Sequence, residues 1–314
     1  MRSARPPSNM APPEGFYHMM SSVSEGIPPL VTAGPPPGLF AGTSYSVRAI
    51  WDSRELLSLL VRREIKARYK DSSLGLLWSL FRPLTQLLIY YVAIGKFLNA
   101  ERSVPDYAIF VFTGLTVWAL FAEVLSGSTT SIIANSGLIK KVYLPREIFP
   151  LASLGSALFN FAVQFGILLI ATVALNRAPW HMQILYLPLA LAVVLLFSFS
   201  LGLLLSAVNV YLRDFQHLVE VLLLVLFWAS PIVYSYKLVH KVLNGNWLEQ
   251  VYLANPVTLV VMGFQKAMWL AADTEIWPPN LALRLVIVAL ISVLLLWAAQ
   301  RVFARLEGNF AQEL

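Results

Sequence analysis

The sequence predicts an all-α integral membrane protein with six transmembrane helices, an N-terminal amphipathic interfacial helix, and short re-entrant or interfacial helices before the last span. Of its 314 residues, 58% are hydrophobic and only 13% are charged, which is too few charges for a soluble domain of this length. The apolar residues come in blocks of roughly 20, the length that crosses a hydrocarbon core about 30 Å thick. The cations behind the net charge of +6 gather at the ends of these blocks, so they indicate membrane topology and not nucleic-acid binding.

Residues 1–47 are predicted to form a disordered, Pro-rich cytoplasmic tail. They hold nine prolines and little apolar periodicity, a composition that does not build a core. They lack a continuous apolar stretch, so we do not expect a secretory signal peptide. A dispensable extension, or a true start at Met19 or Met20, is preferred over a docking role for this tail.

Residues 48–72 are predicted to form a basic amphipathic interfacial helix. Asp52 and Glu55 resemble a capping box, which gives a helix start near Ser53. The apolar side chains recur at helical spacing, at Leu57, Val61, Ile65 and Tyr69, and the cations fall elsewhere on the wheel. Such a helix lies in the membrane interface, with its cations among the headgroups.

The membrane domain is predicted over residues 73–305, followed by a cytoplasmic tail, 306–314. The six spans cover about residues 74–97, 107–125, 148–175, 184–210, 218 to an interruption at Ser230-Pro231, and 281–302. Residues 250–272 are expected to form one or two short re-entrant or interfacial helices on the outer side, with a seventh span as the alternative. The flanking cations collect on the side that holds both chain ends, which places both termini in the cytoplasm.

Enzyme chemistry is not indicated. The sequence has no phosphate-binding G-x-x-x-x-G-K-[ST] loop, no H-E-x-x-H, no G-x-S-x-G and no cysteine, and its four histidines are dispersed. No catalytic residue and no metal site is therefore predicted. Glu123 and Glu220 are the only acids predicted deep in the spans, and both lie near span ends, which disfavours a proton-driven carrier. We therefore expect a passage whose energy comes from another protein.

Five motifs in order carry a family resemblance: LVRREIKARYKDSSLGLLWSLFRPL, NSGLIKKVYLPREIFPL, NVYLRDFQHLV, SPIVYS and ANPVTLVV. Together they resemble the transmembrane permease subunit of bacterial type-2 ABC exporters for polysaccharides and lipid-linked cell-envelope glycans, of the O-antigen, capsule, teichoic acid and galactan type. The resemblance covers about residues 50–305. It implies a homodimer in the bacterial inner membrane with two separate ATP-binding subunits, which bind ATP and Mg, and no cofactor in this chain.

The resemblance also implies that residues 131–147 form a coupling segment on the ATPase. The residues expected in this contact are Ser136, Gly137, Leu138, Ile139, Lys140, Lys141, Tyr143, Leu144, Pro145 and Arg146. The alternative, that the cations only fix topology, leaves the apolar Leu138, Ile139, Val142 and Tyr143 unexplained. Docking of a helix in a groove of the ATPase is the expected mechanism.

The glycan channel is expected to be lined by aromatic side chains, which offer sugars a flat apolar surface with a polar edge. The candidates are Trp78, Phe81, Tyr90, Tyr91, Phe227, Trp228, Tyr234 and Tyr236. For any single one of them, an interfacial aromatic belt is the simpler explanation.

Arg82 is the first candidate to bind the pyrophosphate of a polyprenyl carrier, because arginine forms paired hydrogen bonds with phosphate oxygens. Arg62, Arg63 and Lys66 are a second candidate set for this headgroup. Snorkelling is the alternative for Arg82. Neither Arg82 nor Glu123 is expected from the family pattern.

The predicted function is ATP-driven export of a lipid-linked polysaccharide across the plasma membrane, with membrane lipids and the polyprenyl-pyrophosphate-linked glycan as partners. A drug or lipid exporter of the same ABC class is the first alternative. A membrane-bound glycosyltransferase of the same pathway is less favoured, because it needs a large soluble loop with acidic residues. A secondary carrier is the last.

Overall fold

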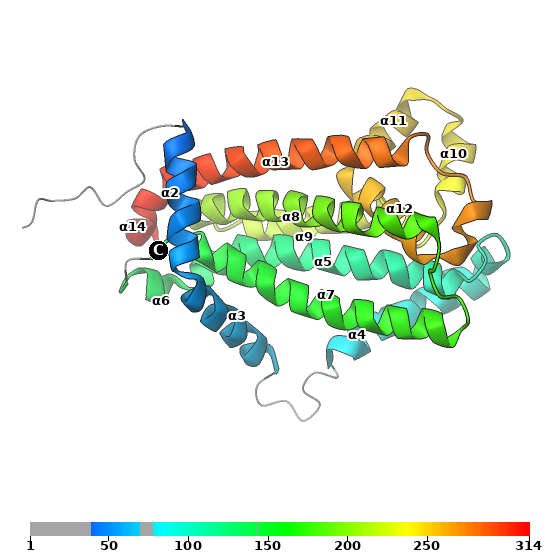
Figure 1. Cartoon of the computed structure of the whole chain (residues 1–314), viewed down its shortest axis with the longest axis horizontal. Coiled ribbons are helices and arrows are strands. Elements are labelled where there is room, and N and C mark those ends of the chain that lie inside the picture. The colour runs from blue at the N-terminus through cyan, green and yellow to red at the C-terminus, as the bar shows by residue number, and fades with distance from the viewer. Residues whose placement is uncertain (1–38, 70–77, 143) are drawn as a thin grey trace, which may run out of the picture. The chain divides into compact units, whose positions relative to one another are not determined.

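The computed structural model describes residues 39–69, 78–142 and 144–314, which all belong to one compact unit, Pro36–Leu314. All regular structure in these described ranges is helical (Figure 1). Among the described residues, four helices are long and apolar enough to cross a membrane: α5 (Tyr107–Ala134), α7 (Ile148–Ala174), α8 (Tyr186–Tyr211) and α13 (Leu281–Leu306). The prediction of a helical, multi-pass integral membrane protein is therefore confirmed.

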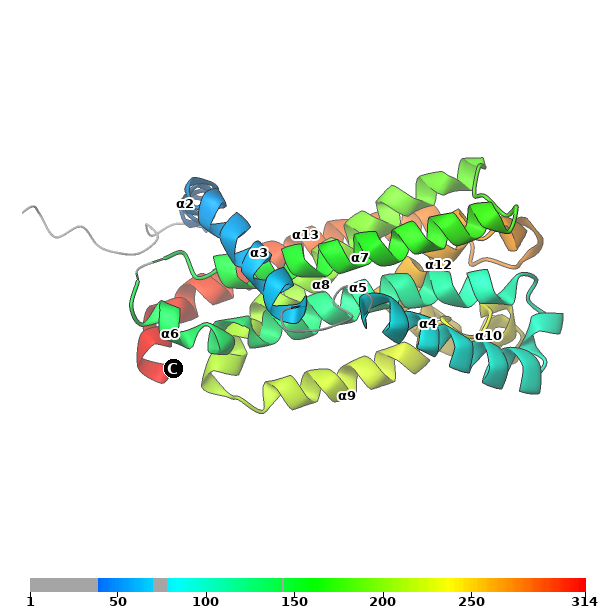
Figure 2. The same ribbon diagram turned by 90° about the horizontal axis from the view of Figure 1, so that it is seen from below.

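The four long helices run side by side, with α8 against both α5 and α13, and α7 against α5 (Figures 1 and 2). Small residues allow this close packing: a Cβ atom built on Gly202 of α8 would lie 2.6 Å from the Cβ of Ser128 on α5. Several buried hydroxyls are satisfied within their own helix, as where Thr113 Oγ1 donates to the Ile109 carbonyl at 2.8 Å. Such internal pairing is what a segment in lipid requires.

Two shorter helices accompany the bundle. Helix α4 (Trp78–Tyr90) continues as the π-helix η2 (Tyr91–Phe97), so most of the predicted first span is helical, and residues 74–77 lie outside the described residues. Helix α9 (Phe215–Trp228) ends just before Ser230-Pro231, where the interruption is predicted.

The end of α5 differs from the prediction. The second span was expected to stop near Leu125, but α5 continues to Ala134. Residues 126–134 are rich in serine and threonine, a composition typical of a loop. Within the helix these side chains instead donate to backbone carbonyls of the preceding turn, as Thr129 Oγ1 does to Leu125 at 2.7 Å.

Between α9 and α13 the chain forms α10 (Tyr236–Leu243), α11 (Trp247–Ala254), α12 (Pro256–Met268) and the 3-10 turn η5 (Leu270–Thr274). Asn255 caps α12, since its Oδ1 accepts from the Val257 amide at 3.0 Å. Helix α12 is buried on nearly all sides against α8, α5 and α13. An interfacial helix would keep one face exposed, so α12 belongs to the core.

The N-terminal part also differs from the prediction. Helix α2 (Leu39–Asp52) occupies part of the expected tail, and a turn at Ser53 separates it from α3 (Arg54–Tyr69). Helix α2 crosses the end of α13 (Figure 1), where Arg301 Nη2 donates to Thr43 Oγ1 at 2.7 Å. The many prolines and glycines of the neighbouring residues give this segment the composition of a disordered tail, so composition does not predict the short helix. Residues 1–38 of the expected tail lie outside the described residues.

A second apolar cluster, here called the end cluster, lies where α6 (Ser136–Ile139) and the last residues meet the bundle. Its buried members are Leu60, Ile132, Ile139, Ile148, Phe149, Ala152, Leu203, Ala207, Val210, Ala299, Phe303 and Phe310. The expected C-terminal tail is therefore not free: η6 (Glu307–Asn309) and α14 (Phe310–Glu313) fold back, and Phe310 is fully buried.

Candidate functional site

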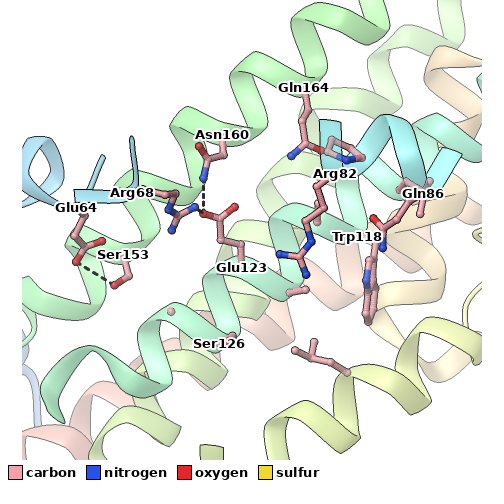
Figure 3. A pocket seen from close by; sticks show the side chains of 16 residues that line it. Glu64, Arg68, Arg82, Gln86, Trp118, Glu123, Ser126, Ser153, Asn160 and Gln164 are labelled. Carbon is pink, nitrogen blue, oxygen red and sulfur yellow. Dashed lines mark hydrogen bonds and ion pairs between the residues drawn. The ribbon is translucent and has the colours of Figure 1, made fainter. Parts of the chain in front are cut away.

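A cavity of about 780 Å³, here called the polar pocket, opens between α3, α4, α5 and α7 (Figure 3). Polar side chains from all four helices line it: Glu64, Arg68, Arg82, Gln86, Glu123, Ser126, Ser153, Asn160 and Gln164. Polar groups at this depth of a membrane bundle are costly unless they pair or bind something, so their concentration marks a functional site.

The helices position these groups by simple spacing. On α7, Ser153, Asn160 and Gln164 share one face, because residues 7 and 4 apart point the same way on a helix. On α5, the small residues Ala119 and Ala122 line the pocket and leave the space open.

An ion pair joins helix α3 to the bundle. Arg68 Nη1 on α3 pairs with Glu123 Oε1 on α5, and Asn160 Nδ2 on α7 donates to the same oxygen at 2.6 Å (Figure 3). The side chains of Arg68 and Glu123 are 45% and 23% exposed. Glu123 is thus held as a charged acceptor between a cation and an amide, a strong type of hydrogen bonding.

Glu64 lies beside this ion pair. Burial raises the pKa of its carboxyl group, and Ser153 Oγ donates to its Oε1 at 3.4 Å. The charged form of this carboxylate is therefore less favourable here than in water.

Two further groups reach the pocket without a hydrogen-bond partner in the described part of the chain. The guanidinium of Arg82 extends into the pocket from α4 (Figure 3), where it is available to an anion. Gln164 is only 8% exposed, and its Oε1 atom is buried and accepts no hydrogen bond.

The predicted headgroup cations divide between two places. Arg82 lines the polar pocket, whereas Arg62, Arg63 and Lys66 do not; they lie exposed on α3, where Arg63 bonds to Asn135. Arg68, on the same helix, was not among the predicted site residues. Its role follows only from its ion pair with Glu123.

The remaining pocket residues were also missed as site residues. Asn160 and Gln164 are spaced four apart in an otherwise apolar helix, and this spacing was a usable signal. Trp118 and Glu123 lie on α5 among many apolar residues, and only the packing against α3 and α7 shows their importance.

The predicted channel aromatics do not form one surface. Tyr90 stacks on Phe227 with ring centroids 5.7 Å apart, and Phe81 and Trp228 are exposed. Tyr234 donates to the Trp228 carbonyl at 2.7 Å, and the Tyr91 ring lies near the Lys96 ammonium. The side chain of Trp78 lies outside the described residues.

Two of these aromatics are buried. Phe227 is buried between Tyr90, Trp118 and Trp228, and Tyr236 is buried with its hydroxyl bonded to Glu249. Both rings therefore contact protein in this conformation and present no face to a channel.

The predicted coupling residues are partly buried and partly exposed. Helix α6 has four residues, too short to dock as a helix in a groove, and Ile139 is only 6% exposed because it packs in the end cluster with Leu138. Intramolecular packing thus explains these apolar residues. Lys140, Lys141 and Val142 are exposed, and Gly137 is too.

The rest of the segment turns back toward the bundle. Ser136, Leu144 and Pro145 are partly exposed, and the Arg146 guanidinium lies 5.6 Å from the centre of the Phe310 ring. Tyr143 lies outside the described residues. In the described ranges, no group of three His, Asp or Glu residues is placed to hold a metal ion.

Comparison with known proteins gives one consistent result. The sequence profile of the ABC-2 type transporter family matches residues 55–269. The chain is 30% identical over 272 residues to the O-antigen export system permease protein RfbA of Myxococcus xanthus, covering 85% of this chain and 98% of that protein.

Two more distant relatives agree with this match. RfbA of Klebsiella pneumoniae is 26% identical over 211 residues, 67% of this chain and 79% of that protein. The polysialic acid transport protein KpsM of Escherichia coli is 26% identical over 208 residues, 64% of this chain and 76% of that protein.

Proposed function

This chain belongs to the ABC-2 type transporter family, and we propose that it is the permease subunit that exports a lipid-linked polysaccharide from the cytoplasm. It is a transporter component without a catalytic domain. The observation that carries the proposal is the family match across most of the chain, together with relatives named for O-antigen export and for polysialic acid transport. Its lack of a phosphate-binding loop agrees with a separate source of energy.

The proposed topology has six spans and two cytoplasmic termini in the bacterial inner membrane. The four long helices supply four spans, and the continuous helix Trp78–Phe97 and α9 supply the other two. Helix α9, with 14 residues, is about 21 Å long at 1.5 Å per residue, so the turn at Ser230 completes that span. The buried α12 is then a re-entrant element.

The proposed partners are a second copy of this chain and two ATP-binding subunits, which bind ATP and Mg. Helices α6 and α14 lie at one end of the bundle, and α10 and α11 lie at the other (Figure 1). The exposed Lys140, Lys141 and Val142 at the α6 end are the proposed contact for the ATPase. Their charge also fits the cytoplasmic side.

The polar pocket is the proposed binding site for the carrier pyrophosphate. Arg82 supplies a guanidinium with no described hydrogen-bond partner, and its fork of N–H donors matches phosphate oxygens. Arg68 adds a second cation when it releases Glu123. A drug exporter would not need a paired-donor anion site at this depth.

The test is reconstitution of the chain with its ATP-binding subunit in liposomes, and measurement of ATP-dependent movement of a lipid-linked glycan. We expect Arg82→Gln to lower export at least about tenfold and Arg82→Lys to restore part of it. Arg102→Gln, at an exposed arginine away from the polar pocket, is the matched control. Transport of amphipathic drugs without transport of glycan would favour the drug exporter instead.

A further inference from the structure

One part of the polar pocket carries neutral hydrogen-bonding groups beside an indole ring. Trp118, Gln86 and Gln164 line this part, which we call the neutral end. Phe121 and Phe227, which do not line the pocket, pack against Trp118 with ring centroids 5.6 and 5.5 Å away. The Trp118 ring is therefore held in place by the core while it borders open space.

The Gln164 carbonyl oxygen is the second observation. It is buried in the pocket wall and accepts no hydrogen bond, although such atoms are nearly always paired in folded proteins. A buried acceptor that is left unpaired is costly, so a donor supplied by a ligand in the pocket would stabilise this atom. Asn160, one turn away, already donates to Glu123 and has other interactions.

The neutral end lies at a distance from Glu64 and next to Arg82, which precedes Gln86 by one turn of α4. Gln164 follows Ser153, the partner of Glu64, by eleven residues on α7, about 16 Å along the axis at 1.5 Å per residue. The cavity of about 780 Å³ falls in the range of roughly 300–1,000 Å³ typical of small-molecule sites. It is long enough and large enough for a diphosphate and an adjoining ring.

We propose that the neutral end binds the sugar that is attached directly to the carrier diphosphate. A pyranose has an apolar face that packs on an indole and hydroxyl groups that donate to a carbonyl oxygen, which are the two features present here. The inference rests on the proposed function and adds that the permease recognises the first sugar of its cargo as well as the diphosphate. Trp118 and Gln164 would select this sugar, and Arg82 would hold the phosphate.

The test uses purified permease in nanodiscs and two probes, polyprenyl diphosphate and polyprenyl diphospho-N-acetylglucosamine. We expect the wild-type chain to bind the sugar-bearing probe about tenfold more tightly, the scale of one hydrogen bond and one ring contact. Trp118→Ala and Gln164→Leu should each remove most of this preference and leave the affinity for the bare diphosphate within about twofold. Arg82→Gln should weaken the binding of both probes.

Two controls keep the result interpretable. Trp118→Leu preserves apolar volume without the flat ring, so it replaces Trp118→Ala if the alanine variant does not fold. Trp180→Ala, at a strongly exposed tryptophan, should behave as wild type.

Equal wild-type affinity for the two probes would overturn the inference and leave the proposed function standing if ATP-driven glycan export is observed. A preference that survives both Trp118→Ala and Gln164→Leu would also overturn it. Failure of glycan export with the probe preference intact would instead contradict the proposed function.

Discussion

The ion pair between Arg68 and Glu123 is expected to hold helix α3 against the bundle. Glu123→Gln removes the charge but keeps a carbonyl that can accept from Asn160, so it isolates the ion pair. A fully buried charged hydrogen bond contributes about 1.5–3 kcal/mol, and an exposed ion pair less than about 1 kcal/mol. With side chains 45% and 23% exposed, we expect about 1 kcal/mol, a fivefold change in the opening equilibrium of α3.

The sequence contains no cysteine, so a single introduced cysteine provides the only thiol in the chain. The rate at which this thiol is labelled can therefore be measured directly. Leu60→Cys places this thiol on the buried face of α3, where the native side chain is 4% exposed. Maleimide reaches it only when α3 lifts, so the labelling rate follows the opening equilibrium. Glu123→Gln should raise this rate about fivefold. The double variant Glu123→Gln, Arg68→Gln should raise the rate by less than the product of the increases caused by the two single substitutions.

Val124→Cys is the control, because Val124 is fully buried in α5 and reports opening of the bundle itself. Its labelling rate should stay the same in the Glu123→Gln background. If the Leu60→Cys rate did not change, or if both rates rose together, the ion pair would not be what holds α3 in place.

Three other predictions follow from the packing and the electrostatics. Gly202→Val should lower stability by about 1–3 kcal/mol in thermal unfolding, because even a Cβ atom there meets Ser128, whereas Gly166→Val, with nothing within 4 Å, should have a much smaller effect. Phe310→Ala should speed hydrogen exchange across residues 136–146 by loosening the end cluster. Unchanged exchange would show that packing on Phe310 does not hold this segment in place. Hydrogen bonds, first from the Tyr236 hydroxyl, lower the pKa of Glu249 below 4.5. The charged Glu249 therefore stabilises the folded protein above pH 4.5, and this stabilisation is lost as the pH falls through the lowered pKa. Glu249→Gln should lose this acid sensitivity in unfolding measured between neutral pH and about pH 3.

The long apolar helices were predictable from the sequence, since periodicity and length alone define them. The predicted span 148–175 corresponds to α7, Ile148–Ala174, and the predicted break at Ser230-Pro231 follows the end of α9. Helix α2 was not predictable from composition, because its stability depends on tertiary contacts such as Arg301 with Thr43.

The polar pocket was only partly predictable. Arg82 could be singled out because a cation within an apolar run is costly wherever it lies. Its neighbours could not, because Glu123 on α5 and Asn160 on α7 meet only through the relative register of two helices, which no single-sequence pattern specifies. For the same reason, Ile139 reads as an exposed docking residue in the sequence and is in fact buried in the end cluster.

The end cluster packs together parts of the chain that are far apart in sequence, including α3, α6 and the C-terminal residues. A push delivered at α6 would therefore tilt α3 directly, without first deforming the long helices. Arg68 lies on α3 and lines one side of the polar pocket, so a tilt of α3 would widen or narrow the opening of the pocket. Movement of α6 would then change the opening of the polar pocket by way of α3.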